Sequence, residues 1–495
     1  MADTDTFESS RVAFEALVGF FAGPEAAGLA HAHLEARLKA DGFEVLRQVL
    51  QDHFDLRAAT EERHEAPVGS DGRPRPYVEA AHTRALVTIF GQVSVTRLAY
   101  RAKCATNLFP ADAASNLPAE VHSHGLRELA AIEAARGSFE GAKHALDRGS
   151  GASVAKRQVE DLARAAAVDF EAYYATANRP VAEPGQVVVL SADGKGIVMR
   201  PEGLRAATAA KAARSKNKLN GRLSKGEKAN RKRMAEVGAV YVVEPVPRTP
   251  SDVMARSDGP RPTEAPKAKD KWLTASVAND AATVIAGVFA EAERRDPDHS
   301  HDWVALVDGN RHQIERIEVE AAARNITVTI VVDWVHVLEY LWSAAWSFFA
   351  EGDPDAEEWV QAKSIEILSG RASIVAAAIR RKATALGLDA ATRKNADTCA
   401  DYLLAKAAYL VYPTALASGW PIATGVIEGA VRHVVKDRMD ITGARWGLEG
   451  AEAVLKLRAL RSNDAWEDYW AFHLANERRR VHESRYLDGA IPTAA

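Results

Sequence analysis

Three acidic residues stand at positions where carboxylates could do chemistry. Asp193 and Asp308 each follow an apolar run typical of a buried strand, and each precedes a glycine that lets the backbone turn sharply. Glu428 lies in the first turn of an expected helix, between apolar residues and a glycine. An acid in such surroundings is costly unless it is exposed or has a partner such as a metal ion.

These three residues could form a metal centre. Open α/β sheets form their sites at the carboxyl ends of strands, so carboxylates there would face one crevice. Converging carboxylates repel each other unless a divalent cation neutralises them, and hard oxygen ligands suit Mg²⁺ or Mn²⁺. Two such ions would suit phosphodiester chemistry. The opposing interpretation is that Asp193 and Asp308 are turn residues, because Asp-Gly is a common turn signal.

Other residues could support such a site. Asp333 and His336 form a D-x-x-H element at an expected helix start, where an N-cap aspartate and a hydrogen-bonded histidine are favoured over zinc ligation. Arg432 follows Glu428 by four residues, on the same helical face, and could contact phosphate oxygens.

The elements that must position these residues indicate an α/β domain with a mixed sheet. Short strands are expected in 186–192, 196–200 and 235–244, with an edge strand in 272–277. Strands in 301–308 and 326–333 then alternate with helices in 279–294 and 311–324. From residue 334 onward nearly all of the chain is expected to be helical.

Two segments could bind a polyanion. The arm Arg205–Arg233 holds eleven Lys or Arg against one acidic residue, although it could instead be a solvated tether. Residues 138–170 have helix-turn-helix spacing, with Ser138 and Ser153 as expected caps, although an ordinary helical hairpin has the same pattern. Trp446 could stack on a base, although core packing is favoured. The residues expected to contact DNA are Lys156, Arg157, Arg164, Lys216, Lys218, Arg222, Arg231, Lys232, Arg233, Lys436, Arg438, Arg445 and Trp446.

The composition says little about the function and more about the cellular compartment. The 495 residues include 63 basic and 67 acidic side chains, so any basic surface must be local. Two cysteines, Cys104 and Cys399, cannot form a disulfide framework and fit a reducing compartment. The N-terminus has no signal-peptide pattern, and the apolar stretches fall short of the ~20 residues that span a membrane.

Taken together, these segments resemble a known family. SADGKG, VALVDGN, VVDWVHVLEYLW and the long block ATGVIEGAVRHVVKDRMDITGARW look like a bacterial insertion-sequence transposase of the Kra-type group, related to the Mutator-like DDE superfamily. The resemblance covers most of the chain, from the TIFGQVSVTRLAYRAKC segment to the C-terminal helices. Related proteins often carry paired cysteines after that segment, and here only Cys104 remains.

The resemblance implies a fold and an activity. It implies an α/β fold, a ribonuclease-H-like catalytic core with a helical insertion, preceded by a mostly helical N-terminal DNA-binding region. Asp193, Asp308 and Glu428 would bind Mg²⁺ (or Mn²⁺), with Asp333 and His336 nearby but outside the triad. Metal-activated water would cut DNA at the element's end, and the freed 3′-hydroxyl would attack target DNA.

It also implies partners and a domain order. The partners would be double-stranded DNA, as terminal repeats and target, and further copies of the chain in a homodimer or higher oligomer. The protein would be located in the bacterial cytoplasm, at the nucleoid. The expected divisions are a helical N-terminal region (1–76), a hairpin with a helix-turn-helix-like region (77–180), the first part of the core (181–341) with the basic arm 205–233 and a Pro-rich loop 245–266, a helical insertion (342–421), the last catalytic helix (422–462) and a C-terminal helix and tail (463–495).

Two other functions stay open on the sequence. A metal-dependent nuclease of the same fold would cut DNA without joining strands. A domesticated DNA-binding protein would have lost catalysis, although the intact acidic triad argues against that.

Overall fold

The chain divides into two compact units. The computed structural model describes residues 6–214, 231–255, 262–441 and 443–492. The first unit is formed by Met1–Ala177 and Asp464–Ala495, and the second by Asn178–Asn463. These divisions lie next to the expected boundaries 180/181 and 462/463. That the C-terminal segment joins the N-terminal unit was not expected from the sequence.

The first unit combines helices with one β-hairpin. The hairpin expected within 77–180 is present: β1 and β2 pair in antiparallel fashion, and Gly91 at the turn has φ +125°, which favours glycine. The main elements of the unit are α1 (Glu8–Ala22), α2 (Pro24–Ala27), α3 (His31–Ala59), β1 (Tyr77–Thr88), β2 (Gly91–Arg101), α4 (Pro110–Ala114), α5 (His124–Arg136), α6 (Phe139–Gly149), α7 (Lys156–Ala166), α8 (Phe170–Thr176) and α21 (Trp466–Val481).

The α6–α7 connection is shaped by the hairpin. Ser138 caps α6 as predicted, because its Oγ accepts a hydrogen bond from the Gly141 N–H. The predicted cap at Ser153 is wrong: α7 begins at Lys156, and Ser153 Oγ donates to Asp147 instead. The connection is kept extended because Gly151 donates its N–H to the Ile89 carbonyl of the hairpin.

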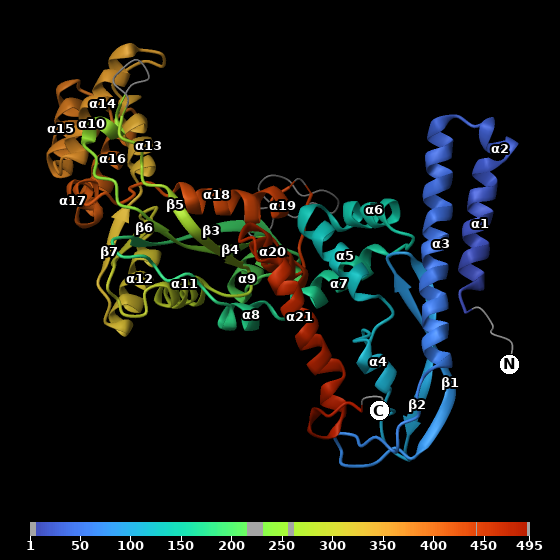
Figure 1. The fold of residues 1–495 in the computed structure, drawn as a ribbon. Coiled ribbons are helices and arrows are strands. Elements are labelled where there is room, and N and C mark those ends of the chain that lie inside the picture. Colours follow the sequence, from blue (N-terminus) through green and yellow to red (C-terminus); the bar gives the residue numbers. More distant parts are fainter. Residues whose placement is uncertain (1–5, 215–230, 256–261, 442, 493–495) are drawn as a thin grey trace. The chain divides into compact units, whose positions relative to one another are not determined.

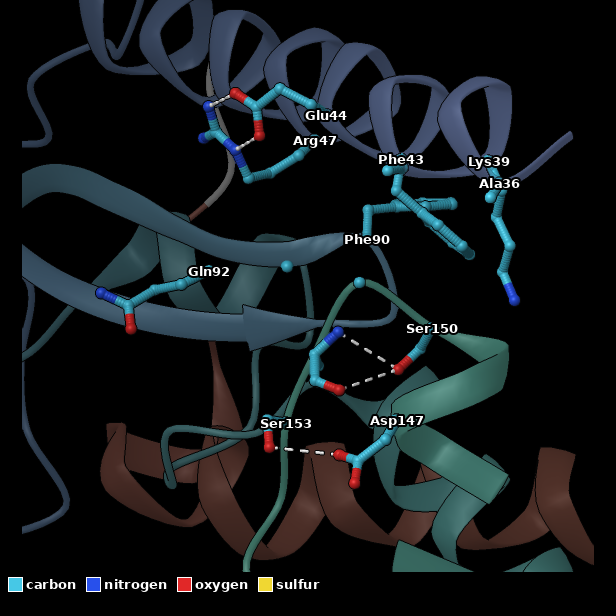
Figure 2. A pocket seen from close by; sticks show the side chains of 14 residues that line it. Ala36, Lys39, Phe43, Glu44, Arg47, Phe90, Gln92, Asp147, Ser150 and Ser153 are labelled. Atoms are coloured by element: carbon cyan, nitrogen blue, oxygen red, sulfur yellow. Dashed lines mark hydrogen bonds and ion pairs between the residues drawn. The ribbon is translucent and has the colours of Figure 1, made fainter. Parts of the chain in front are cut away.

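A cavity of about 670 Å³ lies where these elements meet (Figure 2). It is bordered by α3, the hairpin turn and the α6–α7 connection. Its two cations are already engaged, since Lys39 donates to the Arg148 carbonyl and Arg47 pairs with Glu44. The rings of Phe43 and Phe90 also line the cavity (Figure 2).

The second unit is built on a five-stranded mixed sheet. The strands are β3 (Val187–Val198), β4 (Lys232–Val243), β5 (Ala268–Ser276), β6 (Asp302–Val307) and β7 (Val328–Val332). Their order is β5-β4-β3-β6-β7, with β3, β4 and β5 antiparallel and β3, β6 and β7 parallel. The predicted α/β class with a mixed sheet is confirmed.

One strand differs from the prediction. The expected break at Asp193 and Gly194 does not exist, because β3 continues through both residues to Val198. The reason is the partner strand β4, which pairs with β3 along its whole length, from Val187 opposite Val243 to Val198 opposite Lys232.

Helices pack on both faces of the sheet (Figure 1). Helix α11 packs on one face, where a Cβ at Gly238 would meet the side chains of Val284 and Val288. Helices α18 and α20 pack on β3, β4 and β5 from the other side. The helices of this unit are α9 (Ala206–Arg214), α10 (Pro250–Val253), α11 (Ala281–Arg295), α12 (Arg311–Arg324), α13 (Trp334–Ala345), α14 (Pro354–Leu368), α15 (Ala372–Ala385), α16 (Lys394–Ala405), α17 (Tyr412–Ala417), α18 (Gly425–Ala430), a π-helix (Val431–Lys436), α19 (Asp437–Met439) and α20 (Leu448–Ser462).

The expected helical stretch 342–421 consists of the end of α13 and helices α14 to α17. Within the Pro-rich loop 245–266, Val246 donates its N–H to the Gly419 carbonyl after α17. Residues 256–261 of that loop are outside the described part. None of the helices in the described part of the chain is both long and apolar enough to cross a membrane.

Candidate active site

Three aspartates stand side by side at one edge of the sheet. Ser191 of β3 lies opposite Leu306 of β6, and continuing this register by two residues brings Asp193 beside Asp308. The next pair of strands ends in the same way, because Asp333 donates its backbone N–H to the Val307 carbonyl at 2.8 Å. The parallel strands β3, β6 and β7 thus deliver one carboxylate each to the same edge.

The turn interpretation holds for one aspartate and fails for the other. Gly309 has φ +90°, and Asp308 Oδ1 accepts the N–H of Asn310 at 2.7 Å, so Asp308 does lie in a tight turn. Asp193 lies inside a continuous strand, at the point where β3 loses its parallel neighbour. A carboxylate at this point is half-buried without being needed for any turn.

Asp333 connects the sheet to the helix that carries Glu428. Its carboxylate is fully buried and accepts N–H groups from Val335, His336 and Thr424, at 3.2, 3.3 and 3.0 Å. Thr424 Oγ1 in turn donates to Glu428 Oε1 at 3.0 Å. Asp333 therefore caps α13, as predicted, and also fixes the residues where the chain returns from the helical stretch to the sheet.

The charges of the three predicted triad residues act on one another. The pKa of Asp193 is raised above its ordinary value, first by burial and then by the negative charges of Asp308 and Glu428. The N–H of Gly194, which donates to Asp193 Oδ1 at 2.6 Å, and the nearby His336 oppose this rise in pKa. Asp193, Asp308, Glu428 and His336 therefore share one electrostatic environment with excess negative charge.

The donor set fits a hard divalent cation, but the carboxylates do not form a closed cage. Asp193, Asp308 and Glu428 offer only oxygen, as Mg²⁺ or Mn²⁺ prefers. Within the described part of the chain, no three His, Cys, Asp or Glu side chains lie close enough to hold a metal ion as they stand. An ion would have to draw the carboxylates together or share its shell with water and a phosphate.

Aromatic side chains adjoin the acids, and the sequence analysis missed them. Tyr402 of α16 donates its hydroxyl to the Asp308 carbonyl at 3.1 Å, and its ring stacks on Tyr340 with centroids 4.0 Å apart. A Cβ at Gly309 would come within 2.8 Å of the Tyr402 hydroxyl oxygen, so that contact favours glycine. Nothing local signals Tyr402, which is 94 residues from Asp308; Thr424 could have been noticed as a hydroxyl residue directly before a helix.

The basic residues after Glu428 divide into exposed and buried ones. Arg432 and Lys436 are exposed on the π-helix that directly follows α18, and Arg445 is exposed in the next loop. Arg438 and Trp446, however, are not available to DNA in this structure.

Both residues belong to the packed interior. The Arg438 guanidinium carbon lies 4.5 Å from the centre of the Trp446 ring, and the Trp446 N–H donates to the Met439 carbonyl. The backbone of residue 446 pairs with the end of β3: its N–H donates to the Val198 carbonyl, and its carbonyl accepts the Arg200 N–H. This pairing turns the indole inward. The core-packing alternative for Trp446 is the one the structure shows.

The basic arm is only partly described. Lys216, Lys218 and Arg222 lie outside the described residues. Lys232 is exposed at the start of β4, and Arg231 is partly exposed just before it. Arg233 instead donates to the carbonyls of Val277, Gly203 and Ala278, so it ties β4 to neighbouring segments rather than extending freely.

In the first unit, the predicted DNA-contacting residues line the exposed side of α7. Lys156, Arg157 and Arg164 are all exposed, whereas Val159 and Leu162 of the same helix are buried. Lys156 pairs with Glu140 of α6 at 3.4 Å, and Arg164 pairs with Asp161 at 3.3 Å. Such exposed pairs are weak, so a phosphate could displace them.

The chain matches no protein-family model, and no curated protein resembles it significantly.

Proposed function

We propose that the chain is a metal-dependent transposase that cuts DNA at the ends of an insertion sequence and joins the freed 3′-hydroxyl to target DNA. The observation that supports the proposal is that strand register brings Asp193 beside Asp308 and that the charges of both Asp308 and Glu428 act on Asp193. The three residues come from three separate parts of the chain, and the pKa of Asp193 responds to both of the others. A ribonuclease-H-like core is part of this proposal, and the five-stranded mixed sheet is compatible with it.

The residues have distinct roles in this proposal. Bound Mg²⁺ or Mn²⁺ would activate the attacking water or hydroxyl and stabilise the leaving oxygen. Asp193, Asp308 and Glu428 would hold the ions, and Asp333 and Thr424 keep Glu428 in place through the hydrogen bonds described above. Arg432 and Lys436 are exposed on the helical segment that follows Glu428, and Arg445 is exposed in the next loop; all three could contact the DNA backbone.

The unneutralised charge supports catalysis over a purely structural role. A structural carboxylate cluster would be expected to include balancing cations, whereas the largest charge effects on the pKa of Asp193 come from two further acids, Asp308 and Glu428. The same feature argues against a domesticated protein that only binds DNA, since such a protein would gain nothing from the clustered acids.

The test is strand cleavage and joining by the full-length protein. The substrates are labelled duplexes taken from DNA flanking the chain's own coding sequence, mixed with a plasmid target and Mg²⁺ or Mn²⁺. Glu428→Gln should lower both cleavage and joining by at least ~10³-fold, as loss of one metal-binding or charge-stabilising group does. Glu357→Gln on the exposed first turn of α14 is the matched control and should behave as wild type.

Two other outcomes would identify another function, and a third would change the set of site residues. Cleavage without joining would establish the nuclease alternative. DNA binding with no cleavage in wild type, under any of these metals, would establish the domesticated protein. Cleavage that survives Glu428→Gln would remove that residue from the site.

A further inference from the structure

The N-terminal helices expose an apolar face that the rest of the described chain leaves uncovered. Of the twenty large hydrophobic side chains that are exposed among the described residues, seven fall between positions 12 and 49. By contrast, Ser10, Ala26 and Asp52 are the only buried residues of α1, α2 and α3. These helices therefore hold most of their apolar side chains at the surface rather than in a core.

Helices α1 and α3 form an antiparallel pair. Near the start of α1, the Ser10 N–H donates to Asp52 in the second half of α3. Near the end of α1, the Phe20 ring lies 4.6 Å from the guanidinium carbon of Arg37 in the first half of α3. The two helices run side by side in Figure 1.

The exposed residues gather on one side of this pair. On α3, Leu38, Leu46 and Val49 follow a helical stripe that is turned away from α1 and from β2. The helical period places Phe14 and Val18 of α1 on the flank next to that stripe. We call these five residues the hairpin face; each is between 41% and 56% exposed.

Gly42 lies at the centre of the stripe, four residues from both Leu38 and Leu46. It is an unfavourable residue in the interior of a 29-residue helix, and a Cβ added there would meet nothing within 4 Å. None of the described residues therefore requires a glycine at this position. A missing side chain would, however, let the backbone of another helix approach closely.

We propose that the hairpin face is a dimer interface, in which the α3 helices of two copies cross near Gly42. In a two-fold arrangement about this glycine, Leu38 of one copy meets Leu46 of the other, so the surface is complementary to itself. Five half-exposed side chains of this size present roughly 400 Å² of apolar surface. With the usual polar rim the dimer buries about 1,300 Å² in total, above the roughly 1,000 Å² of a specific interface.

The charges of the segment favour a protein partner over a polyanion. Residues 8–59 carry eight acidic side chains against five basic ones, which disfavours DNA and anionic membranes. A second copy brings the same face at equal concentration and needs no further component. The interface would act without DNA or metal, so it does not rest on the proposed catalytic function.

The test is the molar mass of the full-length protein in solution, without DNA, by light scattering during gel filtration at micromolar concentrations. Wild type should be a dimer. Leu38→Glu/Val49→Glu should raise the dimer dissociation constant at least tenfold and give monomers. Val319→Glu/Ile374→Glu, which changes two equally exposed residues on α12 and α15, should leave the dimer intact.

Gly42→Leu separates the interface from folding. It should give monomers while the melting temperature stays equal or rises, because leucine favours a helix more than glycine does. A monomeric wild type would overturn the proposal, and so would a dimer that persists in both the double variant and Gly42→Leu. A monomer that sediments with phosphatidylserine vesicles would instead identify a membrane as the occupant.

Discussion

Two buried or half-buried aspartates, one in each unit, have opposite surroundings. Asp169 in the first unit accepts hydrogen bonds from Arg480 at 3.0 and 3.1 Å and contacts His473 Nδ1 at 2.7 Å. Burial alone would raise the pKa of Asp169, but these partners outweigh it and hold the pKa below its ordinary value. Asp193 in the second unit has acids as neighbours, and its pKa is raised.

Buried charged side chains are arranged differently in the two units. In the first unit, Arg127 is also buried and is balanced by Glu120 and Glu477, so this network joins α21 to α5 with charges of both signs. In the second unit, the largest charge effects on Asp193 come from two further acids, Asp308 and Glu428. The first arrangement stabilises the fold, whereas the second lowers stability and favours a bound cation.

The largest effect is expected from breaking the balanced network. Asp169→Ala leaves the buried His473 without its carboxylate partner and also removes the ion pair with the exposed Arg480, so it should lower the free energy of unfolding by about 3–5 kcal/mol. Chemical denaturation followed by circular dichroism measures it. Asp161→Ala, which breaks an exposed pair with Arg164, is the control and should cost less than about 1 kcal/mol. An equal loss in both variants would contradict the distinction.

A smaller effect should follow from loosening Glu428. Thr424→Val removes the hydroxyl that donates to Glu428 and should slow DNA cleavage about 3- to 10-fold, the value of one hydrogen bond. Thr424→Ser keeps the hydroxyl and should restore the rate, which a purely structural role of the threonine methyl group would not allow. Equal rates in the valine variant and wild type would show that Thr424 does not position Glu428.

The smallest effect concerns the unbalanced charge itself. Because the pKa of Asp193 is raised in the folded state, its ionised form lowers stability at neutral pH, and this penalty is absent below about pH 4. Asp193→Asn should therefore raise stability at pH 7 by at most about 1 kcal/mol, with the gain vanishing as the pH falls through the titration of Asp193. Thermal unfolding at several pH values measures it.

Metal provides the control for this prediction. Mn²⁺ at ten times its dissociation constant should stabilise wild type by about 1.4 kcal/mol and leave Asp193→Asn nearly unchanged. A variant that is less stable than wild type at pH 7 without metal would show that Asp193 is a structural carboxylate like Asp169.

Local patterns in the sequence were sufficient for most of the sheet strands and for the caps at Ser138 and Asp333. The apolar runs before Asp308 and Asp333 predicted β6 and β7, and Asp333 was recognised as an N-cap. The break predicted at Asp193 failed because Asp-Gly is only a statistical turn signal, and pairing with β4 outweighs it. The cap predicted at Ser153 failed because the hairpin holds that segment extended.

The sequence by itself determined which residues could do chemistry, because residue type and position after an apolar run are local properties. Only the tertiary structure decided which of them meet. Strand register brings Asp193 beside Asp308, and the buried Asp333 reaches Thr424 across 91 residues, a distance that no local pattern encodes. Burial likewise withdrew Arg438 and Trp446 from the surface, because exposure depends on what packs against a residue and not on the residue alone.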